Sequence, residues 1–299
     1  MTLPRMVLTQ QDPDLGKVVR YYTETRADYA LWSSRLNMHF GFWKPGMSVL
    51  DREAMLEQMN VEVADRLGVD DMHMPRVLDM GCGVGTAAST VARRRPGAAV
   101  TGVTLVPWQA SEARRQRLAS EEPVSFTSPS VILSDYTMTP FRDEQFDAVY
   151  SIESACYAAG LAKEDLLREM ARLVRRGGRF VVADAFLRRR DIANPVTRAA
   201  HRSLCASWAL ETLGHIGAFT ACAERVGFGK IAVEDISLNV LPSSLHIPAV
   251  TMRFLATTLL AGGVPSRDRW LNASTGGPLF LLAADPSAAG YFMVTATRR

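Results

Sequence analysis

The chain has 299 residues, which is enough for one large α/β domain or for a core domain with a lid. It is 47% hydrophobic and 22% charged, as is ordinary for a globular protein. The net charge is only +3, so neither nucleic acid nor a membrane surface is expected as a partner.

The sequence also bears on the cellular compartment. No stretch approaches the roughly 20 uninterrupted apolar residues of a membrane span, and the N-terminal apolar run is too short for a signal peptide. The four cysteines form no C-x-x-C pair and match no zinc spacing, so we expect free thiols and no metal site. Together these features predict a cytoplasmic protein.

Residues 1–70 are predicted to form a helical N-terminal cap. Residues 15–34 should be a helix with four large aromatic side chains, and residues 37–47, with two glycines and a proline, should be a loop. Residues 51–67 place apolar side chains at helical spacing behind Asp51, a good N-cap residue. The first helix has more apolar surface than is needed to attach it to the rest of the chain, so we expect a homo-oligomer formed through it.

Strands and helices alternate regularly over residues 71–186, the expected core. The predicted strands are 76–80, 99–105, 131–134, 146–153 and 179–186. Predicted helices cover 86–95, 107–120 and 163–174 between them. Strands that alternate with helices of 10 to 15 residues indicate an α/β fold with a parallel, doubly wound sheet.

Residues 187–299 should hold the remaining core strands, at 230–240 and 290–298, and two helical inserts, 187–215 and 241–287. Such inserts are the natural place for a substrate lid. The first insert is rich in basic residues, which could grip a phosphate, diphosphate or carboxylate or could form a solvated helix face. These residues are Arg188, Arg189, Arg190, Arg198, His201 and Arg202.

A glycine-rich turn follows the strand at 76–80. Gly81, Gly83 and Gly85 occupy alternate positions, and Asp79 comes two residues before the first of them. Glycine permits tight dihedrals and lets a ligand approach the backbone closely. A site for NAD would need an acid at the end of the second strand, where Thr104 stands instead.

The GxGxG turn with its preceding acid resembles motif I of class I S-adenosylmethionine-dependent methyltransferases. The resemblance implies a Rossmann-like fold with a seven-stranded sheet, a helical N-terminal segment and helical lid inserts, and it implies S-adenosylmethionine as the cofactor. Asp79 would then meet the methionine ammonium of the cofactor, because a carboxylate facing a cation gains a charge-assisted hydrogen bond. Gly81, Gly83 and Gly85 would lie beneath its amino-acid and ribose parts.

Two further segments carry the same resemblance. Residues 102–109, GVTLVPWQ, resemble the second-strand signature of sterol-, tocopherol- and cyclopropane-fatty-acid-type enzymes, which implies ribose-side contacts from Thr104, Leu105 and Gln109. Asp135 and Tyr136 follow the third strand, where the family places an acid near the adenine amino group. An Asp after a strand is also a common turn residue, so both interpretations stay open.

The aromatic N-terminal segment resembles the Y-x-x-x-[TS] and H-[FH]-G-[FY] segments of sterol and tocopherol methyltransferases. The likeness is carried by Tyr21, Tyr22, Thr23, Tyr29 and Trp32 together with the run Met38–Trp43, and we place Tyr22 at the cofactor site. Aromatic faces can stabilise a sulfonium or a carbocation, although the same rings could simply pack the helix onto the core.

Three residues are candidates for catalysis: Glu153, His39 and Tyr157. Glu153 ends the fourth strand, where ligands of open α/β sheets bind, and could accept a proton, although it could also be a structural acid. His39, Tyr157 and His246 are alternatives for the base. We expect C-methylation of an isoprenoid or isoprenoid-bearing natural product, a hydrophobic small molecule. The alternative is O- or N-methylation of an aromatic or amine metabolite.

Overall fold

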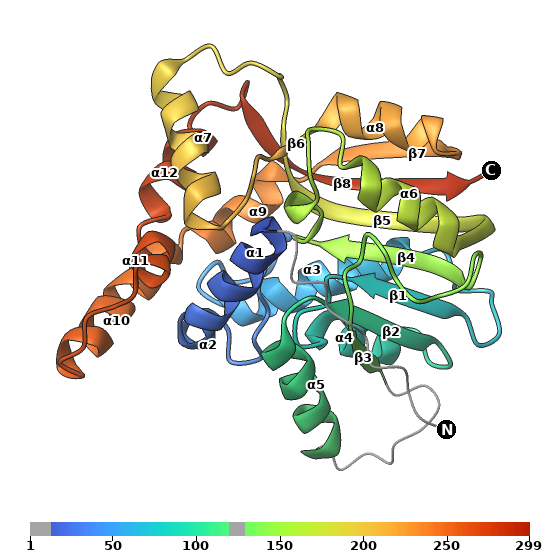
Figure 1. Cartoon of the computed structure of the whole chain (residues 1–299), viewed down its shortest axis with the longest axis horizontal. Coiled ribbons are helices and arrows are strands. Elements are labelled where there is room, and N and C mark those ends of the chain that lie inside the picture. The colour runs from blue at the N-terminus through green and yellow to red at the C-terminus, as the bar shows by residue number, and fades with distance from the viewer. Residues whose placement is uncertain (1–12, 120–128) are drawn as a thin grey trace.

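The computed structural model describes residues 13–119 and 129–299. In these residues one mixed sheet runs through the molecule in the order β3-β2-β1-β4-β5-β8-β7, with a short β6 paired to β5 (Figure 1). The strands are β1 Arg76–Met80, β2 Ala99–Thr104, β3 Ser130–Leu133, β4 Phe146–Ile152, β5 Val174–Leu187, β6 Gly214–His215, β7 Phe228–Asp235 and β8 Ala289–Arg298.

The predicted α/β fold is confirmed, with two differences in the sheet. β6, at residues 214–215, adds a two-residue strand to the seven of the main path. β8 runs antiparallel to both β5 and β7, so the expectation of a parallel sheet is wrong for the last strand. β1 to β5 pair in parallel, and helices connect β1 to β2, β2 to β3 and β4 to β5.

Helices cover both faces of the sheet. On one face lie α3 Arg52–Arg66 and α4 Thr86–Arg94, and on the other lie α6 Glu164–Leu173 and α8 Ile216–Arg225. α5 Pro107–Ala119 packs beside β3. The central strands are apolar on both sides for this reason, and each face has its own hydrophobic core cluster.

The N-terminal segment differs from the single helix expected at 15–34. It forms α1 Pro13–Glu24 and α2 Arg26–Trp32, which meet at Thr25. Thr25 is buried, and both its amide and its hydroxyl donate hydrogen bonds to the carbonyl of Tyr21, at 2.9 and 2.8 Å, an arrangement that often bends a helix. The loop at 37–47 and the N-cap at Asp51 are confirmed, since Asp51 accepts a hydrogen bond from the amide of Ala54.

The predicted strand at 230–240 is too long. β7 ends at Asp235, whose Oδ1 accepts hydrogen bonds from the amide and the hydroxyl of Ser237, and α9 Ser237–Ser244 begins there. An Asx turn of this kind reverses the chain locally and starts a helix.

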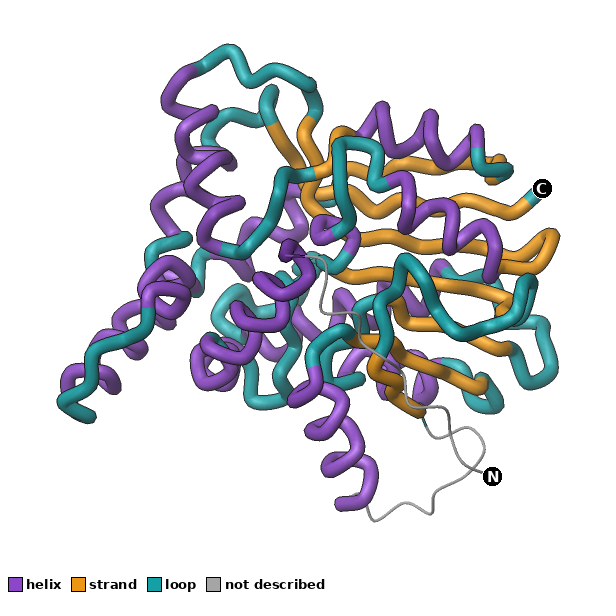
Figure 2. Tube along the Cα trace, viewed as in Figure 1, coloured by secondary structure: helices purple, strands orange, loops and turns teal. Residues whose placement is uncertain are grey.

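The lid lies at the carboxyl ends of the parallel strands. It consists of α7 Pro195–Ser207, α9, α10 Ile247–Leu260, α11 Arg267–Ala273 and α12 Gly276–Ala283. Figure 2 shows these helices gathered on one side of the sheet, away from the C-terminal end of β8. In the described part of the chain no helix is long and apolar enough to cross a membrane.

The first helices contact the lid of the same chain. Arg269 of α11 donates a hydrogen bond to the buried Asp28 of α2 at 2.7 Å, and Tyr21 of α1 donates one to Asn272 at 2.9 Å. The aromatic face that suggested an oligomer is therefore used inside the chain, and the oligomer stays a prediction without support from exposed aromatic surface.

Candidate active site

Two cavities lie at the carboxyl ends of the strands. The first, of about 690 Å³, borders the glycine turn after β1, and we call it the glycine-loop cavity. The second, of about 330 Å³, lies under the lid helices, and we call it the lid cavity. The residues that line both cavities are Tyr22, Met38, His39, Glu153, Tyr157 and Leu210. A shared wall of this kind brings any occupants of the two cavities close together.

Asp79 lies at the floor of the glycine-loop cavity and is only 2% exposed. The hydroxyl of Tyr150 donates a hydrogen bond to its Oδ2 at 2.9 Å. Burial raises the pKa of Asp79 to about 7, because a single neutral donor does not compensate for lost hydration. The carboxyl group therefore lacks a cationic partner within the described chain, and an ammonium group would supply one.

The three glycines of the turn have different surroundings. Gly81 and Gly83 line the cavity with φ values of +91° and +54°. A Cβ at Gly81 would overlap Ser154, whereas a Cβ at Gly83 would have open space apart from Met38 at 3.8 Å. Gly85, with φ +85°, starts α4 beside Val131 and does not line the cavity. Its role in the structure is to turn the backbone.

The other residues predicted for the cofactor line the glycine-loop cavity: Thr104, Leu105, Gln109, Asp135, Tyr136 and Tyr22. Thr104 donates a hydrogen bond to the Gln109 side-chain carbonyl at 2.6 Å, so the pair is fixed at the end of β2. Asp135 accepts hydrogen bonds from the amide and hydroxyl of Thr137, both at 2.8 Å. Asp135 thus holds a turn and also lines the cavity, and its place near the adenine amino group stays a prediction.

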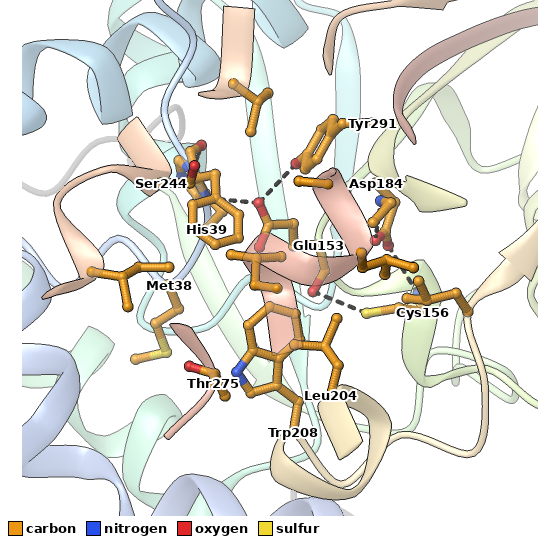
Figure 3. Close-up of a pocket in the computed structure, with 18 of the residues that line it drawn as sticks. Met38, His39, Glu153, Cys156, Asp184, Leu204, Trp208, Ser244, Thr275 and Tyr291 are labelled. Atoms are coloured by element: carbon orange, nitrogen blue, oxygen red, sulfur yellow. Dashed lines mark hydrogen bonds between the residues drawn. The ribbon is translucent and has the colours of Figure 1, made fainter. Parts of the chain in front are cut away.

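Glu153 lines both cavities, and Figure 3 shows its side chain hydrogen-bonded to Tyr291 among the residues of one pocket. Its backbone is left-handed, with φ +47°, which turns its side chain away from the path of β4. Its Oε1 accepts hydrogen bonds from the amide of Phe40 at 2.6 Å and from the hydroxyl of Tyr291 at 2.8 Å. Burial, with a contribution from the nearby Asp184, raises the pKa of Glu153 to about 8.

His39 also lines both cavities, but its ring nitrogens are engaged. Nδ1 lies 2.8 Å from the carbonyl oxygen of Phe40, and Nε2 lies 3.2 Å from Oδ1 of Asn37. Burial lowers the pKa of His39, so the ring is neutral near pH 7. These contacts describe a ring that holds the segment beside Glu153 in place. His246 contacts the carbonyl of Val49 and lines neither cavity.

Tyr157 belongs to an aromatic cluster at the junction of the cavities. Its ring lies 5.8 Å from that of Tyr22, which in turn lies 5.6 Å from Tyr29. All three line the lid cavity, and burial raises the pKa of each phenol well above its usual value. Neutral phenol rings are therefore presented to the cavity.

Comparison with known proteins decides the family. A family model described as "Methyltransferase domain" matches residues 78–182. "Methyltransferase GfsG" of Streptomyces halstedii is 32% identical over 266 residues, which cover 87% of this chain and 86% of that protein. The chain belongs to the S-adenosylmethionine-dependent methyltransferases.

One further sequence relative and one solved structure match this methyltransferase over different shares of its chain. "24-methylenesterol C-methyltransferase 2" of Oryza sativa subsp. japonica is 30% identical over 69% of this chain and 54% of its own length. The crystal structure of geranyl diphosphate C-methyltransferase from Streptomyces coelicolor A3(2), with S-adenosyl-L-homocysteine bound, matches 97% of this chain and 99% of its own at 18% identity and a TM-score of 0.71. The cofactor of the methyltransferase is S-adenosylmethionine, and the buried acceptor carboxyl of Asp79 fits its ammonium group.

Sequence reasoning missed two polar residues of the methyltransferase site. Tyr291 reaches Glu153 from β8, and Asp184 of β5 accepts a hydrogen bond from the amide of Cys156 at 2.9 Å. Burial raises the pKa of Asp184 to about 6. Nothing local in the sequence marks either residue, since both become neighbours of Glu153 only through sheet pairing.

Within the described residues no group of three His, Cys, Asp or Glu side chains could hold a metal.

Proposed function

We propose that this methyltransferase methylates a mainly apolar small molecule held in the lid cavity, and that Glu153 accepts the proton released. The observation that carries the proposal is that Glu153 lines both cavities. When bound, S-adenosylmethionine supplies an electrophilic methyl group. A carboxylate on the wall between the two cavities is close to any acceptor atom placed there, as general base catalysis requires.

The glycine-loop cavity is the proposed cofactor site. Asp79 binds the ammonium group, Gly83 leaves room along the backbone, and the missing side chain of Gly81 makes room for Ser154. Thr104, Leu105 and Gln109 contact the ribose, Asp135 and Tyr136 lie on the adenine side, and Tyr22 faces the sulfonium. Gly85 acts indirectly, by setting the turn into α4.

The first candidate for the acceptor atom is an alkene carbon of an isoprenoid or isoprenoid-bearing natural product. Methylation of an alkene leaves a carbocation, and the rings of Tyr22, Tyr29 and Tyr157 present their faces or edges around the place where it would form. Glu153 then removes a proton from the cation. The names of the sterol and geranyl diphosphate C-methyltransferases agree with this candidate.

The second candidate is a hydroxyl or amine acceptor, for which Glu153 would again serve as the base. A base works best when its pKa lies near the working pH, and burial places the pKa of Glu153 at about 8. A hydroxyl that donates to Glu153 would lose its proton as the methyl group arrives.

Product analysis with methyl-labelled S-adenosylmethionine tests the proposal. The purified protein is incubated with panels of prenyl alcohols, sterols, phenols and amines, and nuclear magnetic resonance locates the label on carbon, oxygen or nitrogen. Release of S-adenosylhomocysteine measures turnover. Methyl transfer only to charged polar acceptors would contradict an apolar substrate, and full turnover by Glu153→Gln would contradict its role as the base.

A further inference from the structure

We infer that the lid cavity selects uncharged acceptors and rejects phosphorylated or carboxylated ones, because Asp235 neutralises the arginine at its end. The inference rests on the proposed function, since it concerns the same cavity. Arg188 is the only lysine or arginine among the described residues that line the lid cavity. Whether the cavity accepts an anion therefore depends on what Arg188 already binds.

Arg188 is held in an ion pair. Its Nη2 lies 2.5 Å from Oδ2 of Asp235, and its Nε donates a hydrogen bond to the carbonyl of Ala289 at 3.2 Å. The guanidinium also lies over the ring of Phe292, 4.8 Å from the centroid. Three contacts thus fix the side chain in one position, and one of them cancels its charge.

Gly290 makes this position possible. A Cβ at Gly290 would overlap the guanidinium of Arg188, and Gly290 itself lines the lid cavity. The acid is fixed as well, because Oδ1 of Asp235 accepts the two hydrogen bonds from Ser237 that start α9. Both members of the pair are therefore held by further hydrogen bonds, Arg188 by the carbonyl of Ala289 and Asp235 by Ser237.

The remaining charged residues of the lid cavity are acids. Asp28, Glu153 and Asp184 line it, and Asp28 is already paired with Arg269. Burial is the main cause that raises the pKa of Glu153 and of Asp184, and the charge of Lys163 only partly offsets it at Asp184. An anionic ligand would lose its hydration here and gain no free cation in return, which makes its binding unfavourable.

The other basic residues of the first insert lie elsewhere. Arg189, Arg190, Arg198 and Arg202 are exposed and line neither cavity. His201 contacts Sγ of Cys205 through its Nε2 at 3.4 Å. The sequence leaves open whether these basic residues bind an anion or form a solvated helix face. The structure favours the solvated face for the four exposed arginines.

Two ligands that differ mainly in charge test the inference. The full-length protein, saturated with S-adenosylhomocysteine, is titrated with geraniol and with geranyl diphosphate in a calorimeter. We expect geraniol to bind at least about tenfold more tightly than geranyl diphosphate. Asp235→Asn keeps an oxygen for Ser237 but frees Arg188, so the affinity for geranyl diphosphate should rise by about tenfold and that for geraniol should stay within about twofold.

Matched variants give the controls. Glu234→Gln removes the neighbouring acid, which pairs with Arg66 outside the cavity, and should change neither affinity. Adding Arg188→Gln to Asp235→Asn should reverse the gain for the diphosphate. Tighter binding of geranyl diphosphate by the wild-type protein, no gain in Asp235→Asn that still binds S-adenosylhomocysteine, or binding of neither probe at millimolar concentration would overturn the inference. Because the probes are scored by binding, these outcomes are distinct from a failure of methyl transfer.

Discussion

The hydroxyl of Tyr291 lies 2.8 Å from Oε1 of Glu153, although the two residues are 138 positions apart in the chain. The contact exists because β8 inserts antiparallel between β5 and β7, so that the side chain of Tyr291 reaches past β5 to the residue that follows β4. The last strand of the sheet thus supplies a donor to the proposed base. A proton donor in this place stabilises the carboxylate form.

Replacing Glu153 with Gln should lower turnover by about 10²- to 10⁴-fold, the range expected for loss of a general base. The affinity for S-adenosylmethionine should change little, because the proposed cofactor contacts remain. Steady-state kinetics with calorimetry of cofactor binding measures both. A Gln variant with wild-type turnover would make Glu153 a structural residue.

Replacing Tyr291 with Phe should move the pH dependence of activity. Burial sets the pKa of Glu153 at about 8, and the hydrogen bond from Tyr291 lowers it, so removing the hydroxyl raises the pKa further. A base must be deprotonated to act, and the acidic limb of the kcat/KM profile should therefore shift to higher pH. An unchanged profile would show that another group controls this limb.

Cofactor affinity should fall as the pH drops through about 7. Burial raises the pKa of Asp79 to about 7, so below this pH the group binds a proton and no longer attracts an ammonium. Asp79→Asn should bind S-adenosylmethionine more weakly than wild type at pH 8 and should lose this pH dependence. Calorimetry between pH 6 and pH 8.5 measures it, and equal affinity in both proteins would remove Asp79 from the site.

Gly81→Ala should destabilise the protein more than Gly97→Ala. Both glycines have positive φ, but a Cβ at Gly81 would overlap Ser154, while one at Gly97 meets nothing within 4 Å. The shared backbone strain costs about 1–2 kcal/mol in each variant, so the difference between them reports the overlap. Thermal unfolding compares the two. Equal losses would mean that Ser154 moves aside at no cost.

Lys163→Met should lower the free energy of unfolding by about 3 kcal/mol, since three buried carbonyls lose their donor. The ammonium of Lys163 is buried and donates to the carbonyls of Cys156, Ala158 and Thr212 at 2.7–3.0 Å, which holds the turn that carries Tyr157. Arg168→Met removes an exposed ion pair and should cost less than about 1 kcal/mol. Urea denaturation distinguishes the two, and a similar small cost for Lys163→Met would contradict this account.

The sequence predicted the local parts of the structure well. The strand at Arg76–Met80 and the helix after the glycine turn follow from apolar runs and glycine positions, which are visible in a short window. The Asp235–Ser237 turn ended a strand that β-branched residues alone would continue, because a side-chain hydrogen bond outweighed strand propensity. Tyr291 and Asp184 could not be predicted as site residues, because their place depends on strand order and on an antiparallel pairing that no local pattern encodes.

Asp235 performs two tasks with its two oxygens, one of which starts α9 while the other neutralises Arg188. A substitution of Asp235 would therefore affect both the start of α9 and the net charge at the lid cavity. Anyone who transplants the lid of a related enzyme onto this scaffold, to change the molecules it accepts, would have to move Arg188, Asp235 and Gly290 as one unit. A graft without Asp235 would leave Arg188 unpaired at the cavity, and any side chain at position 290 would overlap the guanidinium of Arg188.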